Sequence, residues 1–337
     1  MAAAAALGTP LPNPPKDGIT SLQFWADSPL LLVSSWDETA RVYDATAATL
    51  QGTFAAGAPV LDATFENEGV IYTGGLDGSV KRYDFFSGQE AVLGAHDAGA
   101  KCVEWLPTRG LLATAGWDST LRLWDPRAAP GAGQVARLSL PGKAYSMSAS
   151  GQRLVVGCSG RHVDIYDLRT LESGQPEQRR ESSLKFQTRC VRCFADGAGY
   201  ALGSVEGRVA MEFFDLAEDV QARKYAFKCH RRSEGGKDSV FPVNAIAFNS
   251  RYGTFATGGG DGVVNFWDGE NKKRLAQIAG YPTSVAALAF NGAATQLAVA
   301  ASYTFEQGEK EHPADAIFIR EVTEAEVKPK ARQPAAA

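Results

Sequence analysis

A unit of about 40 residues that recurs along the chain restricts the fold more than any other feature of the sequence. Each copy holds a β-rich apolar segment, a turn of the form Gly/Ser-x-Asp, and an aromatic residue followed by Asp that closes the copy seven residues later. The fullest copies are residues 35–44, 75–84, 116–125 and 259–268. Weaker copies close at Tyr166-Asp167, Phe214-Asp215 and Ile319-Arg320.

The spacing of these copies identifies the repeat. The seven closing positions, 44, 84, 125, 167, 215, 268 and 320, are separated by 40, 41, 42, 48, 53 and 52 residues. This is the WD40 period with insertions in the later copies. Short apolar runs bounded by Gly or Asp, such as 69–73 and 111–114, match the strands of four-stranded blades. We therefore predict an all-β, seven-bladed WD40 β-propeller, whose core is continuous only when the ring is closed.

The sequence predicts one propeller over residues 18–320. Ring closure requires an outer strand from the other end of the chain, and the N-terminal segment 1–17 offers a candidate within 7–13. Its prolines oppose a central strand but are tolerated at a sheet edge, where an outermost strand lies. Residues 303–316 are expected to form a polar loop inserted in blade seven, and residues 321–337 a disordered tail.

Composition excludes several classes of protein. The net charge of −4 gives no general reason to expect direct nucleic-acid binding, although residues 179–232 carry +4 against −8 elsewhere. No apolar run approaches the ~20 residues of a membrane helix, and the Ala-rich start lacks a basic region, so neither membrane insertion nor export is expected. Five cysteines, an odd number, suit buried thiols in the reducing nucleus or cytoplasm.

The sequence contains no set of residues that would form a catalytic site. Its four histidines are scattered, and neither a serine elbow nor a glycine-rich phosphate loop occurs. Cys190 and Cys193 form a C-x-x-C string, but on a strand their thiols would point to opposite faces. We predict a protein that is not an enzyme and needs neither metal nor cofactor.

The turns of the repeat separate structural from functional residues. The turn aspartates Asp37, Asp77, Asp118 and Asp261 are predicted to be hydrogen-bond acceptors that fix the turns, aided by residues such as His96. The residue before each aspartate lies at the mouth of the turn on the top face, and blades one and three place Trp36 and Trp117 there. Two such indoles favour a desolvated contact with a partner, and the alternative is that they lie flat on neighbouring blades.

Arg189 differs from the corresponding residues of the other repeats. Counting back five residues from the large apolar residue that ends the first strand gives Ile19, Val60, Ala100, Val243 and Val285. In the fifth repeat, counting from Phe194 gives Arg189. A guanidinium in place of aliphatic carbon is expected to face an anion, because burying an unpaired charge costs several kcal/mol.

Two further basic residues stand near Arg189 in the repeat pattern. Arg208 stands in the turn 205–208 of blade five, and Lys228 begins the run that leads toward blade six. Basic side chains suit carboxylates and phosphates, and a phosphothreonine would supply about −1.5 to −2 charge. The alternative is internal pairing with Glu206, Glu212 or Asp215.

The chain also resembles a known family over nearly its whole length, the Bub-three family of mitotic spindle checkpoint propellers. The strings that carry the resemblance are 17–19, 31–37, 178–190, 224–231 and 318–323. The Rae/Gle propellers of messenger-RNA export are next nearest, and the similarity to them is concentrated at 206–210 and 227–231.

The resemblance implies a scaffold that binds checkpoint kinases of the Bub and Mad/BubR types through their GLEBS segments and brings them to kinetochores. It also implies binding of phosphorylated Met-Glu-Leu-Thr repeats of the kinetochore scaffold, and a link to the anaphase-promoting complex within the mitotic checkpoint complex. Carried over, Trp36 and Trp117 would flank the GLEBS segment, Arg189 would pair with its acidic residues, and Arg208 with Lys228 would hold the phosphothreonine. The implied location is the nucleus and cytoplasm, with the kinetochore and centromere in mitosis.

Two other functions remain open from the sequence. A Rae/Gle-like export adaptor of the nuclear pore would use nearly the same surface, and only its partners would differ. A substrate receptor of a cullin ubiquitin ligase is suggested by the string Trp124-Asp-Pro-Arg127, with a weaker copy at residues 166–169. Both strings also arise as ordinary blade endings.

Overall fold

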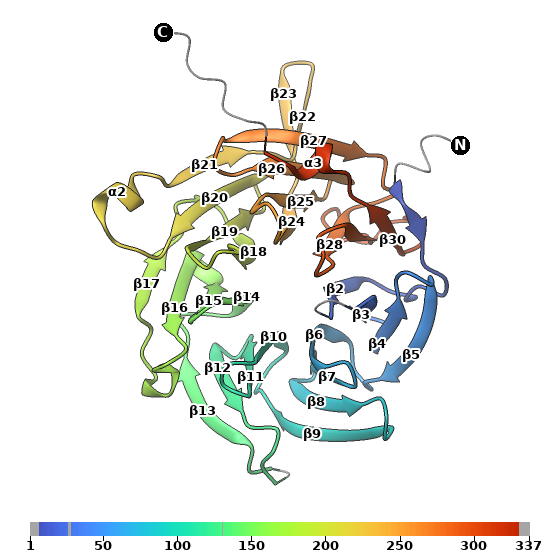
Figure 1. Ribbon diagram of the computed structural model, residues 1–337, viewed down its shortest axis with the longest axis vertical. Coiled ribbons are helices and arrows are strands. Elements are labelled where there is room, and N and C mark those ends of the chain that lie inside the picture. The colour runs from blue at the N-terminus through green and yellow to red at the C-terminus, as the bar shows by residue number, and fades with distance from the viewer. Residues whose placement is uncertain (1–6, 26–27, 130, 330–337) are drawn as a thin grey trace.

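The computed structural model describes residues 7–25, 28–129 and 131–329. Seven four-stranded antiparallel sheets stand around a central axis as the blades of a propeller (Figure 1). The first strand of every blade faces the axis, and the fourth lies at the outer rim. The predicted fold class is therefore confirmed.

The blades follow one another in chain order, and each contains four strands. Blade one has β2 (Ile19–Phe24), β3 (Leu30–Ser35), β4 (Thr39–Asp44) and β5 (Thr49–Ala55); blade two has β6 (Val60–Asn67), β7 (Val70–Gly75), β8 (Ser79–Asp84) and β9 (Gln89–Ala95). Blade three has β10 (Ala100–Leu106), β11 (Leu111–Gly116), β12 (Thr120–Trp124) and β13 (Gln134–Ser139); blade four has β14 (Ala144–Ser150), β15 (Arg153–Cys158), β16 (His162–Asp167) and β17 (Gln178–Glu181). Blade five has β18 (Thr188–Cys193), β19 (Gly199–Ser204), β20 (Arg208–Phe213) and β21 (Tyr225–Lys228); blade six has β24 (Val243–Phe248), β25 (Phe255–Gly259), β26 (Val263–Asp268) and β27 (Lys273–Ala279). Blade seven has β28 (Val285–Phe290), β29 (Gln296–Ala301), β30 (Ala316–Glu321) and β1 (Thr9–Pro10).

A few short elements join or flank the blades. Helices α2 (Glu218–Gln221) and α3 (Glu324–Val327) are single turns, as are the 3-10 segments η1 (Ser159–Arg161) and η2 (Leu171–Ser173). The hairpin of β22 (Arg231–Glu234) and β23 (Lys237–Val240) projects from the ring between blades five and six (Figure 1). No helix within the described residues is long and apolar enough to cross a membrane.

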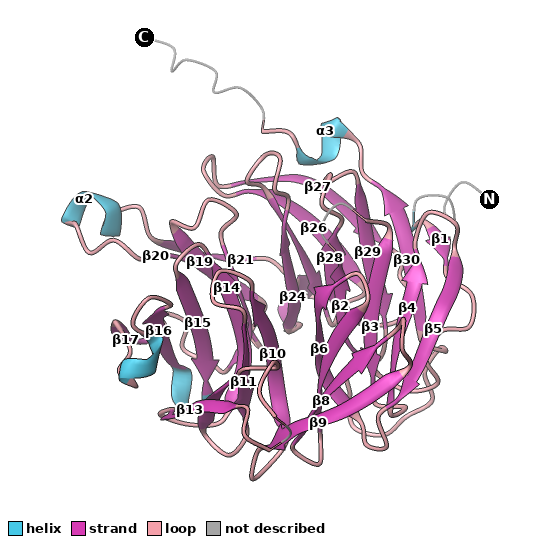
Figure 2. Ribbon diagram, turned by 60° about the horizontal axis from the view of Figure 1, so that its bottom comes forward, coloured by secondary structure: helices cyan, strands magenta, loops and turns pink. Residues whose placement is uncertain are grey.

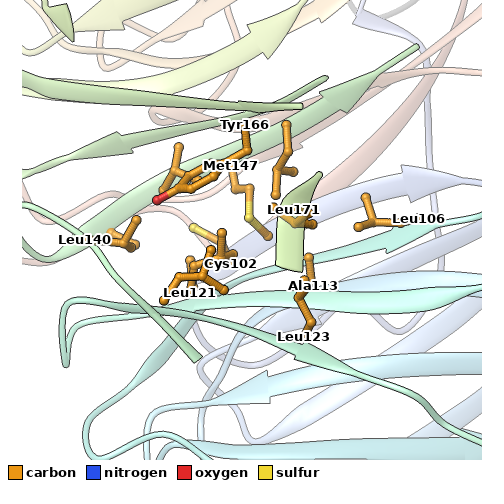
Figure 3. Packing of buried hydrophobic residues seen from close by; sticks show 14 of the residues in the cluster. Cys102, Leu106, Ala113, Leu121, Leu123, Leu140, Met147, Tyr166 and Leu171 are labelled. Atoms are coloured by element: carbon orange, nitrogen blue, oxygen red, sulfur yellow. The ribbon is translucent and has the colours of Figure 1, made fainter. Parts of the chain in front are cut away.

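The hydrophobic core lies between blades, where the faces of neighbouring sheets meet. Figure 3 shows one such layer, in which Cys102 and Leu106 of β10 and Leu121 of β12 meet Met147 and Tyr166 of blade four. Tyr166 is fully buried, and the layer mixes small and large side chains. Because each layer belongs to two blades, a blade removed from the ring would expose apolar surface on both sides.

Polar side chains along the central wall connect each blade to the next, and all of them except Ser302, which follows β29, belong to the inner strands. Thr20 Oγ1 donates to the carbonyl of Val60 (2.8 Å), and the Val103 amide donates to Asp62 Oδ2 (2.9 Å). Equivalent bonds cross the five other interfaces, through Glu104 to blade four, Ser146 to blade five, Cys190 to blade six, Asn244 to blade seven and Ser302 to blade one. The ring is thus hydrogen-bonded along its inner wall as well as packed.

Blades three and six each contain a buried chain of four side chains. In blade three, Trp124 Nε1 donates to Thr114 Oγ1 (2.8 Å), which contacts His96 Nε2 (2.8 Å), while His96 Nδ1 lies 3.0 Å from Asp118 Oδ1. An indole can only donate and a carboxylate can only accept, so the Thr114 hydroxyl donates to His96 and a neutral His96 donates to Asp118. His230, which sequence reasoning left unassigned, repeats this arrangement with Asp261, Thr257 and Trp267.

The turn aspartates accept the expected hydrogen bonds. Asp37, Asp77 and Asp118 each accept the amide and hydroxyl of the residue two positions later, Thr39, Ser79 and Thr120. Asp261 accepts from His230. This role is confirmed.

The N-terminal segment forms the outer edge of blade seven. Strand β1 pairs antiparallel with β30, with Thr9 opposite Ile319 and Pro10 opposite Phe318. Leu11 is buried, and the carbonyl of Asn13 accepts from Arg41 Nη1 (3.0 Å) and the Tyr43 hydroxyl (2.8 Å) of blade one. The segment therefore ties the last blade to the first.

The chain after residue 320 differs from the expected disordered tail. Thr323 and Glu326 form a capping box that begins α3, and Val327 is buried among side chains of blades six and seven. Thr254 Oγ1 donates to the carbonyl of Val327 (2.8 Å). Figure 2 shows α3 at the edge of the ring, where it joins the end of blade seven to blade six. The expected tail is wrong for residues 321–329, because a local cap and one apolar anchor suffice for docking, and residues 330–337 lie outside the described part.

We expect His96→Ala to lower the free energy of unfolding by about 2–4 kcal/mol at neutral pH, because Asp118 and Thr114 lose a buried partner. Burial lowers the pKa of His96, so the unfolded chain binds this proton more readily than the folded chain. The contribution of His96 is therefore complete above a pH of about 6.5 and is lost as pH falls through the lower folded pKa. Denaturant titrations across this pH range measure both effects, with exposed His312→Ala as the control. Equal losses in the two variants would contradict the assignment.

Val327→Asp should lower the unfolding temperature by several degrees, because a carboxylate would replace an apolar side chain that is 3% exposed. Lys328→Ala, one residue further along and exposed, is the matched control. Calorimetric scans of both variants test the contribution of α3. A melt unchanged by Val327→Asp would show that α3 adds nothing to the ring.

Candidate functional site

A cavity of about 910 Å³ opens at the centre of the top face, which carries the loops that lead into the first strand of each blade and the turns between its second and third strands. Side chains from all seven blades line it, so the ring and not any single blade creates the site. Three of the five residues singled out from the sequence, Trp36, Trp117 and Arg189, lie in this lining.

One irregularity, repeated seven times, shapes the wall of the cavity. In every blade the pairing of the first strand with the second shifts after the first residue, so the second residue is the extra residue of a β-bulge. All seven bulge residues line the cavity, and they are Thr20, Leu61, Lys101, Tyr145, Arg189, Asn244 and Ala286. The bulge thus presents one side chain per blade to the centre.

The position assigned to Arg189 from the sequence is off by one residue. The structural equivalent of Ile19, Val60, Ala100, Val243 and Val285 is Thr188, which pairs with Ser204 as the others pair with the second strands of their blades. The count failed because Cys193, not Phe194, occupies the place of the large apolar residue that ends the first strand. Arg189 therefore occupies the variable bulge position, not a position that is aliphatic elsewhere.

Arg189 nevertheless has the surroundings expected of a ligand-binding cation. Its Nε donates to Asn244 Oδ1 (3.1 Å), the bulge residue of the next blade. No ion pair in the described part of the chain involves Arg189. The guanidinium is half-buried, lines the cavity and keeps further N–H groups for a partner.

The two tryptophans occupy equivalent positions. The Trp36 amide donates to the Gly18 carbonyl and the Trp117 amide to the Gly99 carbonyl, each at 2.9 Å. A Cβ on Gly99 would stand 2.9 Å from the Trp117 ring, so glycine is needed there for the indole to lie over the loop. The Trp36 side chain is also packed against its glycine, Gly18, yet Trp36 is 40% exposed. Both indoles are thus supported from below and reach the cavity.

Sequence reasoning missed several residues of the cavity. Phe305, from the loop that joins β29 to β30, is 62% exposed and lines the cavity beside Tyr303. Lys101 and Tyr145 occupy bulge positions, and a correct register would have located them. Nothing in the repeat pattern indicated Phe305, because its loop is an insertion that no other blade shares.

Arg208 and Lys228 lie apart from the cavity, on the outer part of blade five. They face each other across β20 and β21. Arg208 Nε is 3.7 Å from Glu206 Oε2, without a hydrogen bond, so the internal pairing considered from the sequence exists in weak form. The Lys228 side chain is exposed. The five residues therefore form two groups. Trp36, Trp117 and Arg189 lie at the opening of the central cavity, which we call the central mouth. Arg208 and Lys228 lie on the outer part of blade five, which we call the flank.

A smaller cavity of about 490 Å³ lies between blades four and five near α2. Glu212 in its wall lies 3.2 Å from Lys224 Nζ and 3.9 Å from Arg180 Nη1, and it accepts from the Ser183 hydroxyl (2.9 Å). The charged side chains that line this cavity are thus largely paired with one another.

The cysteines behave as buried thiols. Cys190 Sγ donates to the Val243 carbonyl of blade six and Cys193 Sγ to the Ser148 carbonyl of blade four, so the two thiols point to opposite neighbours as expected. Burial raises the pKa of each to about 12. All five cysteines are free, and the described residues contain no cluster of three or more metal-ligating side chains.

Comparison with known proteins agrees with this architecture. The sequence profile of the family described as WD domain, G-beta repeat matches residues 8–44, 88–125 and 227–268. The chain is 57% identical to mitotic checkpoint protein BUB3.1 of Arabidopsis thaliana, with 96% of this chain and 95% of the relative covered. It is 48% identical to mitotic checkpoint protein bub3 of Dictyostelium discoideum, over 94% and 95% of the two chains. The Poly(A)+ RNA export protein of Schizosaccharomyces pombe is 34% identical, over 95% and 92%.

Proposed function

The chain belongs to the Bub-three family of mitotic checkpoint proteins, and we propose that it is a non-enzymatic checkpoint scaffold that binds GLEBS segments of checkpoint kinases at its central mouth. It carries these kinases to kinetochores by binding phosphorylated repeats of the kinetochore scaffold on its flank. A role in the mitotic checkpoint with partner proteins, and a nuclear or kinetochore location, follow from the family.

One observation supports peptide binding at the mouth above all others. Trp36, Trp117 and Arg189, from blades one, three and five, line a single cavity. Indoles give an acidic peptide large rigid contact surfaces, and an arginine without a carboxylate partner gives its acidic side chain a bidentate site. An extended segment across the mouth would meet all three.

Three features support phosphopeptide binding on the flank. Arg208 and Lys228 are directly opposed on neighbouring strands, so their cationic ends can converge on one phosphate. The only carboxylate that forms an ion pair with Arg208 in the described part is Glu206, and its distance of 3.7 Å leaves the guanidinium free to bind a stronger anion. The flank also belongs to the positively charged segment 179–232.

An export adaptor is the second candidate, because the chain is also similar to a Poly(A)+ RNA export protein over nearly its whole length. The mouth would serve either role. Affinity capture from mitotic and interphase cells separates them, since recovery of nucleoporins and polyadenylated RNA without checkpoint kinases would favour export.

The ligase-receptor alternative has weaker support. Arg127 donates from Nε and Nη2 to both carboxylate oxygens of Asp125, and Arg169 binds Asp167 in the same way one blade later. The same pairing in two blades indicates a turn that stabilises the blade ending. Loss of ligase-adaptor binding in Arg127→Ala would support the receptor role.

Arg189→Ala should weaken binding of a GLEBS peptide by about 30-fold or more, because the acidic side chain of the peptide would lose its charged partner in a partly desolvated site. The melting temperature should change little, since Arg189 makes a single hydrogen bond to a side chain at the rim. Isothermal calorimetry measures the affinity, and Arg223→Ala on the outer surface is the control for charge. Unaltered affinity in Arg189→Ala would refute the site.

Arg208→Ala and Lys228→Ala should each weaken a phosphorylated Met-Glu-Leu-Thr peptide by about tenfold and leave GLEBS affinity unchanged, because only the phosphate contacts the flank. Raising the salt concentration should weaken the wild type more steeply than either variant. Fluorescence anisotropy with phosphorylated and unphosphorylated peptides measures the difference, with Lys237→Ala as the control. If the variants weaken binding of the phosphorylated and the unphosphorylated peptide equally, the phosphate binds at another place.

A further inference from the structure

The central cavity holds more positive charge than the proposed peptide contacts use. Four cationic side chains line it, namely Lys101, Lys143, Arg189 and Arg192. None of them takes part in an ion pair in the described part of the chain. Their partners are neutral: Lys101 Nζ donates to the Leu61 carbonyl (3.3 Å) and Arg192 Nη1 to the Met147 carbonyl (3.3 Å).

The acidic groups near these cations are few and partly occupied. Asp17 and Asp62 are the carboxylates of the lining. Asp62 accepts the amides of Ala63 (3.0 Å) and Val103 (2.9 Å), and Asp17 accepts the amide of Gly18 (2.7 Å). Glu104, behind the wall, accepts the Ala149 amide (3.3 Å), and burial raises its pKa to about 7, so it is only partly charged at neutral pH. The four cations therefore exceed Asp17 and Asp62 by two charges, and the partly charged Glu104, which interacts with Arg192, reduces this excess without cancelling it.

The inner wall also contains a polar group without a partner. Thr188 is 1% exposed, lines the cavity, and its Oγ1 makes no hydrogen bond. A buried hydroxyl in this condition has lost its hydrogen bonds to water and has gained none within the protein. Thr188 adjoins Arg189 on the strand that also carries Arg192.

The cations are distributed along the depth of the cavity. Lys143 is exposed at the rim, while Lys101 and Arg189 stand at the bulge level. Arg192 lies three residues after Arg189 on β18, deeper in the channel and further from the mouth. An extended peptide across the mouth contacts the upper level and leaves the space that Arg192 faces.

We propose that the central channel is a binding site for a small polyphosphorylated anion of the inositol polyphosphate class, held by Lys101 and Arg192 beneath the peptide-binding mouth. A volume of about 910 Å³ suits such a ligand, since small-molecule sites span roughly 300–1,000 Å³. Several phosphate groups arranged on one compact frame can meet cations from blades three and five at once. A single carboxylate cannot, because Lys101 and Arg192 come from different levels and different blades.

Calorimetric titration with inositol hexakisphosphate tests the site on the full-length chain. We expect saturable binding of one anion per chain, weakened at least tenfold in Arg192→Gln and in Lys101→Gln, and within twofold of wild type in Lys237→Gln, which removes the same charge from the exposed hairpin. A parallel titration with inorganic tripolyphosphate distinguishes a cyclic from a linear polyphosphate source, and either anion showing this pattern supports the site. If one glutamine variant fails to fold, the other decides.

Two results would overturn the proposal. In the first, neither anion saturates, or Lys237→Gln loses as much affinity as Arg192→Gln, which would indicate general surface attraction. In the second, dialysis shows that a GLEBS peptide displaces labelled anion from the chain in equal amount, which would place the anion at the mouth itself. Failure of peptide binding leaves the anion titration interpretable, because Arg192 and Lys101 have no part in the proposed peptide contacts.

Discussion

Hydrogen bonds between polar side chains of each blade and the backbone of the next hold the central wall of the propeller in place. A side chain such as Asp62 or Ser146 belongs to one blade yet satisfies an amide of its neighbour, so its energetic value exists only in the closed ring. The apolar layers between sheets have the same property, because each is shared by two blades. Stability and the shape of the central cavity therefore depend on the same closure, which the N-terminal strand β1 and the C-terminal helix α3 reinforce on both sides of blade seven.

The fold could be predicted because its determinants are local and repeated. A turn aspartate and a closing aromatic residue keep the same spacing in four copies, and the closing positions of all seven copies follow at intervals of 40 to 53 residues, so a weak copy does not hide the repeat. The position of Arg189 was misplaced for another reason than the bulge, because the bulge occurs at the same place in every blade and leaves the count of five residues unchanged. In blade five the small Cys193 ends the first strand and the larger Phe194 follows it. Counting back five residues from Phe194 therefore gave Arg189, whereas counting from Cys193 gives Thr188.

Features that occur only once could not be found from the repeat pattern at all. Helix α3 depends on a capping box and on one buried valine, within a stretch whose composition resembles a disordered tail. Phe305 lies in an insertion of blade seven, and the β22–β23 hairpin in an insertion between blades five and six. Periodicity cannot assign a residue that has no counterpart in the other repeats, and only the folded ring shows which insertions return to the central mouth.

The bulge separates the demands of folding from those of recognition. The residue before it is buried in every blade, and it is Ile, Val, Ala or Thr, because it packs between sheets. The bulge residue has no such duty, since the extra residue is released from regular pairing, and its seven occupants range from alanine to arginine. Seven positions that share one backbone geometry but differ in their side chains thus surround the axis. Arg189 can be substituted there without disturbing the packing between blades, whereas a substitution of the buried Thr188 beside it would disturb that packing. The ligands that bind at the bulge positions are therefore determined by residues that the fold does not constrain.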